Sequence, residues 1–235
     1  MSTTVWHELE NGSYRADLPL WRRLACAAQG PILDLGAGTG RVALDLAARG
    51  HELVALDSDA TLLATLRERS VKVRTHVADA RSFAIAERFG LVLAPMQLAQ
   101  ILGGPSERAA MLSRVREHLL PGGSFAAALV DPREALVGDA AAPPLPDMLE
   151  REGWVFSSQP LTVRKQGGSV VIERRRQAVA PDGSLEHETA RVALELLTPD
   201  ELEREARAAG LRPVERYTIP ESPDHIGSEV VVCRR

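Results

Sequence analysis

The chain has 235 residues, of which 45% are apolar and 26% are charged, as is typical of a soluble globular protein. Its 28 Lys and Arg against 32 Asp and Glu leave a formal net charge of -4, which disfavours broad nucleic-acid binding because phosphate neutralisation dominates such binding. The two cysteines, Cys26 and Cys233, suggest neither a disulfide scaffold nor a metal site. The N-terminus lacks the apolar segment of a signal peptide, and no apolar run could span a bilayer. We therefore expect a cytoplasmic protein with no metal, nucleic-acid partner or membrane span.

Short apolar runs alternate with amphipathic segments over residues 31–130. The runs predict strands at 32–36, 52–56, 71–77, 91–94 and 124–130, and the amphipathic segments predict helices at 39–49, 59–69 and 106–118. Pro and Gly in LLPGG (119–123) are expected to end the third helix before the fifth strand. Strands that alternate with helices require crossover connections, which predicts an α/β fold with a mostly parallel sheet.

The pattern changes from residue 154 onward. Three long extended segments, at 154–165, 169–180 and 185–197, are separated by turn residues and predict an antiparallel β meander. A helix with a capping box formed by Thr198 and Glu201 follows, and then two strands at 212–219 and 229–234. We expect one domain over residues 1–235, with an N-terminal cap segment (1–30) and a β-rich insert at about 143–197 that covers the substrate.

The strongest motif is ILDLGAGTG at residues 32–40, where a buried strand leads into a glycine-rich turn that opens a helix. Glycine lets a ligand lie directly on the main chain, and the N–H groups of a helix N-terminus favour an anion. A dinucleotide site requires G-x-G-x-x-G, and here Arg41 stands at the last glycine position. An acid, Asp34, instead precedes Gly36 by two residues.

This D-x-G-x-G-x-G pattern resembles the class I S-adenosylmethionine-dependent methyltransferase family. The resemblance implies a Rossmann-like seven-stranded mixed sheet whose last strand is antiparallel, with S-adenosyl-L-methionine as cofactor and S-adenosyl-L-homocysteine as product. It also implies that Asp34 engages the methionine ammonium, that Asp57 accepts the ribose hydroxyls, and that Asp79 accepts the adenine amino group. The other cofactor contacts expected from the resemblance are Gly36, Ala37, Gly38, Gly40, Ser58, Ala80, Ala94 and Pro95.

The acceptor is a small molecule that the sequence does not identify. The fourth strand ends in Ala94-Pro95-Met96-Gln97, where amino methyltransferases of bases or glutamine often carry Asn/Asp-Pro-Pro-aromatic. That difference argues against these two substrate classes and leaves other N-methylation open. Candidate substrate contacts, each with ordinary packing as the alternative, are Tyr14, Met96, Gln97, Gln100 and Arg133.

One residue is a candidate catalytic base. In the resembled fold the sixth strand is parallel to the first five, so the loop after it lies at the carboxyl ends of the strands, where ligands bind. That loop contains Glu221, Asp224 and His225, and histidine is the side chain most readily poised as a base near neutral pH. An ordinary surface histidine is the competing interpretation.

Two questions about the insert stay open at this level. Arg174 and Arg176 lie on one face of the second extended segment and Arg175 on the other, and they suit either an acidic substrate or cross-strand pairing with Glu186, Glu188 or Glu195. The apolar face of the insert could form a homodimer contact. The competing hypotheses for the whole chain are an NAD-dependent oxidoreductase and a catalytically inactive cofactor-binding or regulatory module.

Overall fold

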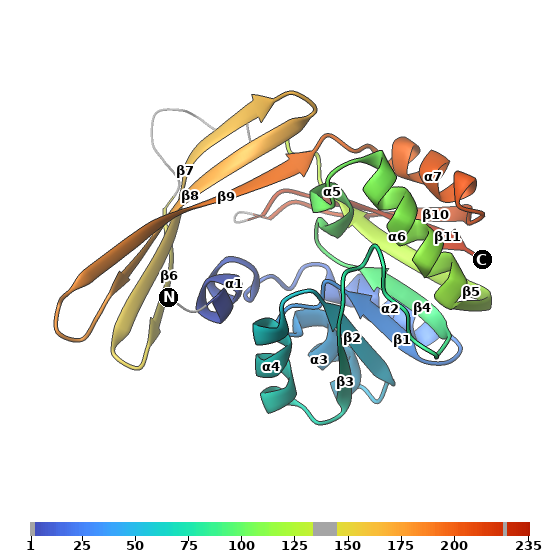
Figure 1. Cartoon of the computed structure of the whole chain (residues 1–235), viewed down its shortest axis with the longest axis horizontal. Coiled ribbons are helices and arrows are strands. Elements are labelled where there is room, and N and C mark those ends of the chain that lie inside the picture. The colour runs from blue at the N-terminus through green and yellow to red at the C-terminus, as the bar shows by residue number, and fades with distance from the viewer. Residues whose placement is uncertain (1–2, 134–144, 223–224) are drawn as a thin grey trace. The chain divides into compact units, whose positions relative to one another are not determined.

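The computed structural model describes residues 3–133, 145–222 and 225–235, and these divide into two compact units (Figure 1). The core unit comprises Arg15–Asp131 and Leu197–Arg235. The insert unit comprises the residues up to Tyr14 together with Pro132–Leu196. Among the described residues, no helix has the length and apolar character needed to cross a membrane.

The core unit is built on a seven-stranded sheet in the order β10-β11-β5-β4-β1-β2-β3. The strands are β1 (Ile32–Leu35), β2 (Leu53–Asp57), β3 (Val73–Val77), β4 (Phe89–Ala94), β5 (Leu119–Leu129), β10 (Arg212–Ile219) and β11 (Ser228–Arg234). β1 to β5 pair in parallel, whereas β11 is antiparallel to both β5 and β10. β10 therefore runs parallel to the first five strands, which confirms the predicted mixed sheet with an antiparallel last strand.

Helices cover both faces of this sheet, so its central strands are apolar on both sides. α5 (Leu98–Ile101), α6 (Pro105–His118) and α7 (Pro199–Ala208) pack on the face that carries Leu33 and Leu35. α2 (Leu18–Ala27), α3 (Arg41–Ala48) and α4 (Ala60–Arg69) pack on the face that carries Ile32. Because side chains alternate along a strand, Asp34 shares the face of Ile32 and points towards the layer of α2 and α3.

The start of β5 differs from the prediction. LLPGG does not form a connection before the fifth strand: α6 ends at His118 and β5 begins at Leu119, which pairs with Phe89. Pro121 is tolerated there because the register between β4 and β5 is interrupted at this point, so its missing N–H breaks no regular ladder. α7 begins with the predicted capping box of Thr198 and Glu201.

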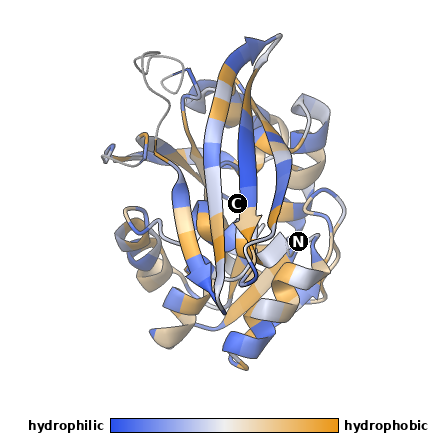
Figure 2. Ribbon diagram, turned by 90° about the vertical axis from the view of Figure 1, so that its left-hand side faces the viewer, coloured by the Kyte–Doolittle hydropathy of each residue, from blue (hydrophilic) through white to orange (hydrophobic). Residues whose placement is uncertain are grey.

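The insert unit contains a four-stranded antiparallel sheet in the order β6-β7-β8-β9. The strands are β6 (Asp147–Arg151), β7 (Trp154–Gln166), β8 (Ser169–Val179) and β9 (Leu185–Glu195). The sequence predicted the three long strands and missed β6, whose residues are mostly exposed and lack clear alternation. Figure 2 shows the long strands in blocks of hydrophilic and hydrophobic colour, as expected for a sheet that is only partly covered.

The N-terminal helix α1 (Thr3–Asn11), which the sequence analysis did not predict, packs on β6 and β7. Its Val5 and Trp6 form a small core with Phe156 and Ala178, and the Trp6 and Phe156 rings meet edge-on with centroids 5.5 Å apart. α1 and the insert strands therefore share one hydrophobic core, although more than a hundred residues separate them in the chain.

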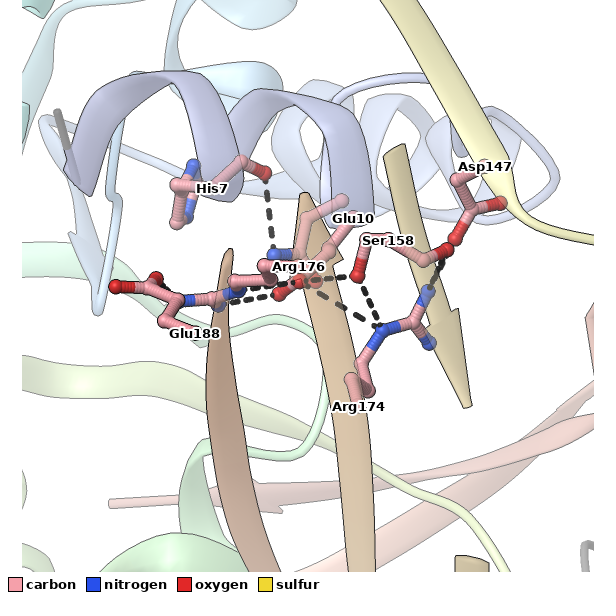
Figure 3. Close-up of polar contacts among 8 residues, drawn as sticks. His7, Glu10, Asp147, Ser158, Arg174, Arg176 and Glu188 are labelled. Atoms are coloured by element: carbon pink, nitrogen blue, oxygen red, sulfur yellow. Dashed lines mark hydrogen bonds and ion pairs between the residues drawn. The ribbon is translucent and has the colours of Figure 1, made fainter. Parts of the chain in front are cut away.

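Polar contacts also tie α1 to the insert sheet (Figure 3). The Arg176 guanidinium donates to both carboxylate oxygens of Glu10 at 2.8 and 2.7 Å, and the Ser158 hydroxyl donates to Glu10 Oε1 at 2.7 Å. Arg174 contacts Ser158 and the carboxylate of Asp147, and Arg176 also reaches Glu188. Of the cross-strand partners considered for this arginine run, Glu188 is confirmed. The other two partners, Glu10 and Asp147, lie on α1 and β6, which were not predicted.

Candidate active site

The predicted cofactor residues come from the carboxyl ends of four neighbouring parallel strands. Asp34 belongs to β1, Asp57 ends β2, Asp79 follows β3 and Ala94 ends β4. Strand pairing places Asp34 beside Ala55 and Leu93, and it places Asp57 beside Val77. The sheet therefore brings the three acids and the glycine-rich turn to one edge, where open α/β sheets bind their ligands.

The glycine-rich turn connects β1 to α3 through backbone conformations that favour glycine. Gly36 has a φ of 66° and Gly40, the residue before α3, a φ of 90°. A Cβ on Gly40 would lie 2.3 Å from a methyl of Leu66 in α4, so a side chain there would displace Leu66 as well as strain the backbone. A Cβ on Gly36 would lie 3.2 Å from Leu98 in α5. The fold itself thus favours glycine at two of the predicted cofactor positions, Gly36 and Gly40, whether or not a ligand binds there.

Asp57 organises this turn. Its Oδ2 accepts from the Gly38 N–H at 2.8 Å and its Oδ1 accepts from the Asp59 N–H at 2.9 Å. An ionised carboxylate has about four acceptor positions, so about two remain for further donors. Asp57 can therefore hold the loop and still accept a vicinal pair of hydroxyls. Ser58, the next residue, is exposed at the same edge.

Asp34 is 1% exposed, and its Oδ1 has no hydrogen-bond partner among the described residues. Burial raises the pKa of Asp34 to about 7, although the Arg41 charge and the Ala43 backbone N–H act in the opposite direction. A buried carboxylate oxygen without a donor is costly, because it has lost its water and gained nothing in return. This atom is the polar group of the site that most clearly lacks a partner.

Asp79 is engaged by its neighbour in a way that the sequence analysis did not anticipate. The Arg81 side chain donates to both Asp79 carboxylate oxygens, at 2.8 and 2.5 Å, and the Arg81 backbone N–H donates at 2.8 Å. Arg81 also donates to Glu107 at 2.7 Å. These hydrogen bonds hold the pKa of Asp79 at about 2, so the carboxylate is ionised at neutral pH. Ala80, which follows it, is buried.

The loop after β4 and the helix α5 hold three of the five predicted substrate residues. Ala94 and Pro95 are buried, Gln97 is half-buried, and Met96 has a left-handed backbone with a φ of 56°, which is uncommon for a residue other than glycine. The Gln100 side chain is fully buried and bonds the Val130 backbone twice, accepting at 2.9 Å and donating at 3.0 Å. Its amide is thus engaged in holding the end of β5 to α5.

The remaining predicted residues, His225, Arg133 and Tyr14, come from other parts of the chain. His225 lies between β10 and β11 and exchanges two backbone hydrogen bonds with Ser222. Because β10 is three strands away from β4, and strands lie about 4.8 Å apart, the base of this loop is roughly 14 Å along the sheet from Ala94. Arg133 is exposed shortly after β5, and Tyr14 is buried in the insert unit. Asp224 and residue 143, the expected start of the insert, lie outside the described residues.

A sequence comparison relates part of the core unit to a known family. Residues 32–123 match the profile of a family described as "Methyltransferase domain". A search of curated protein sequences finds no significant match to the chain. Residues 32–123 are thus similar to a methyltransferase domain, which agrees with the class that the glycine-rich turn and the three acids predict.

Solved structures with the same fold cover nearly the whole chain. The sugar N-methyltransferase KedS8 from Streptoalloteichus has a TM-score of 0.82 at 18% identity, covering 100% of this chain and 93% of that one. S-adenosylmethionine-bound CalS10, an amino pentose methyltransferase from Micromonospora echinaspora, has a TM-score of 0.73 at 21% identity, covering 100% and 98%. The CcbJ methyltransferase from Streptomyces caelestis has a TM-score of 0.69 at 24% identity, covering 95% and 91%.

Proposed function

We propose that this chain transfers a methyl group from S-adenosylmethionine to a small molecule, with the cofactor held by Asp34, Asp57 and Asp79. The observation that carries this assignment is the unpartnered, buried Oδ1 of Asp34 beneath the glycine-rich turn. An ammonium group is the ligand chemistry that such an oxygen accepts best. Asp57 has acceptor capacity left for two hydroxyls, and the charged Asp79 suits an amino group. When bound, S-adenosylmethionine supplies a methyl on a sulfonium that is ready for in-line displacement.

The first test measures turnover. Purified protein is incubated with S-adenosylmethionine and panels of candidate acceptors, and both S-adenosylhomocysteine and acceptors that have gained one CH₂ are followed by mass spectrometry. Calorimetric titrations with S-adenosylmethionine and NAD run alongside. Tight binding of NAD without S-adenosylmethionine would favour the oxidoreductase hypothesis, and cofactor binding without turnover on any acceptor would favour the inactive module.

We propose, as the acceptor, an amino group on a sugar or glycoside. KedS8 and CalS10 are described as acting on a sugar nitrogen and an amino pentose, and their fold extends over this entire chain, including the insert. The turnover panel should therefore contain amino sugars, the matching hydroxyl sugars and simple amines. Methylation of the hydroxyl sugars in preference to the amino sugars would contradict this acceptor class.

We propose that the insert unit provides acceptor selectivity. The chain enters it directly after β5 ends at Leu129, at the carboxyl edge of the core sheet where the cofactor residues gather. Replacing residues 143–196 with a short linker leaves Leu197, which packs in the core, in place. This variant should lose turnover and keep measurable cofactor binding, and retained turnover on the native acceptor would remove the lid role. A homodimer through the apolar residues of the insert is the second proposal for this unit, tested by light scattering.

The role of His225 as a general base is a further proposal, which rests on its loop lying at the carboxyl end of β10. A positioned base contributes about 10²–10⁴-fold, so His225→Ala should lower kcat by that factor while cofactor affinity stays constant. An unchanged kcat over the pH range in which the acceptor is protonated would remove this role. We also propose a cytoplasmic location, consistent with the free thiol of the exposed Cys26.

A further inference from the structure

Arg41, the residue that breaks the dinucleotide pattern, forms a buried ion pair with Asp17. Its two terminal nitrogens donate to the two Asp17 carboxylate oxygens at 2.6 and 2.7 Å, and the side chains are only 9% and 2% exposed. The buried Trp21 indole also donates to Asp17, at 2.7 Å. Two hydrogen bonds therefore join the start of α3 to the start of α2, and the third ties Asp17 to its own helix.

This placement is unfavourable on simple grounds. Arg41 is the first residue of α3, and a cation at a helix N-terminus opposes the helix dipole. Removing two charges from water costs several kcal/mol per ion, and the attraction within a well-formed pair only about offsets that cost. Apolar residues at these two positions would therefore make the fold about equally stable. Arg41 directly follows the glycine-rich turn, which suggests that the pair acts on the ligand site instead.

The group of the proposed site whose charge this pair influences is Asp34. Its side chain points to the same layer as α2 and α3, and the Ala43 N–H from the first turn of α3 donates to it. Arg41 favours the charged form of Asp34, whereas Asp57 on β2 and Asp17 before α2 disfavour it. Its partners on the flanking strands, Ala55 and Leu93, carry no charge.

We propose that the Arg41–Asp17 pair is a positioning element that sets the charge of Asp34, so that cofactor binding at the methionine end is coupled to the release of a proton. This inference rests on the proposed function, because it assumes that Asp34 receives the ammonium of the cofactor. In the empty site burial disfavours the charged form of Asp34, Arg41 favours it, and Asp17 acts against Arg41. The approaching ammonium then completes the ionisation.

The test is the pH dependence of S-adenosylmethionine and S-adenosylhomocysteine affinity, measured by calorimetry in buffers of different ionisation enthalpy. The unaltered protein should release a proton on binding near pH 7, with affinity that rises through that range. Arg41→Met should move the midpoint up by about one pH unit, which is about tenfold weaker binding below the midpoint. Asp17→Asn should move the midpoint down. Titration of the ligand's own amino group is common to all variants and cancels in the comparison.

A matched control exists between the same two helices. Arg22 in α2 pairs with Asp45 in α3 at 2.6 and 2.8 Å, so Arg22→Met removes an α2–α3 ion pair of the same type away from Asp34. It should leave the midpoint unchanged. If Arg41→Met does not fold, two other variants still test the direction of the shift in the pH midpoint. Arg41→Lys keeps the charge and should keep the midpoint near the original, whereas Asp17→Asn should lower it.

The outcomes distinguish a failure of the proposed function from a failure of the proposed coupling. Absence of S-adenosylmethionine binding by the unaltered protein would overturn the proposed function. Binding with the same midpoint in all variants, or weakened binding in both Arg41→Met and Asp17→Asn without opposite shifts, would show a merely structural pair. That result would overturn the coupling and leave the proposed function standing.

Discussion

Removing the Asp57 carboxylate should weaken cofactor binding more than any other single change at the ribose and adenine end. Hydroxyl groups that donate to a charged acceptor contribute about 1.5–3 kcal/mol each, and water partly replaces them, so Asp57→Ala should cost about 2–4 kcal/mol. That corresponds to roughly 30-fold to 1000-fold in the dissociation constant. The same change also removes the acceptor of the Gly38 N–H, which donates to Asp57 at 2.8 Å, and so loosens the turn of the proposed cofactor site.

The assay is calorimetric titration with S-adenosylhomocysteine, with Asp57→Asn and Asp59→Ala as comparisons. Asp57→Asn keeps one acceptor oxygen but replaces the other with an NH₂ group, which faces a donor. Its cofactor affinity should therefore lie between that of Asp57→Ala and that of the unaltered protein. Asp59 caps α4 by accepting from the N–H groups of Thr61 and Leu62 at 2.8 and 3.3 Å. Asp59→Ala should therefore cost about 1 kcal/mol of stability and little affinity. Equal affinity losses for Asp57→Ala and Asp59→Ala would refute this placement of the ribose.

Three further outcomes are expected. Asp79→Ala should weaken cofactor binding by about 1–2 kcal/mol in the same titration, less than Asp57→Ala, because it loses one amino contact; a larger loss would contradict the assignment of the adenine end. Gln100→Ala leaves the Val130 N–H and carbonyl without their partner and should cost about 2–4 kcal/mol, seen as a thermal midpoint lower by roughly 5–15 °C. Burial alone would raise the pKa of Glu10, but hydrogen bonds from Arg176 and Ser158 outweigh it and hold the pKa below the ordinary 4.5. Glu10 therefore stabilises the fold above that value and loses this contribution as the pH falls through its lowered pKa. In Glu10→Gln the free energy of unfolding should consequently decrease less steeply as the pH is lowered. An unchanged slope of unfolding free energy against pH would contradict the role of this ion pair.

Much of the core unit could be predicted because its signals are local. A parallel strand buried on both faces must be continuously apolar, so β1, β2 and β4 are legible as short apolar runs. Tight turns and helix starts depend on residues next to one another, which made the glycine-rich turn and the Thr198–Glu201 capping box visible. The acids Asp34 and Asp57 were found for the same reason, since a strand end and its following loop are one stretch of chain.

The sequence by itself thus determined the class of fold, and it predicted the edge of the sheet where the proposed site lies and the acids assigned to it. Only the tertiary structure decided which side chains are already engaged: Asp17 with Arg41, and Glu10 with Arg176, a pair 166 residues apart. Exposed or irregular segments such as β6 carry little periodicity, so their partners cannot be inferred from spacing. The physical reason is that two residues far apart in the sequence form an ion pair only when tertiary packing brings them together, and that packing exists only in the folded chain.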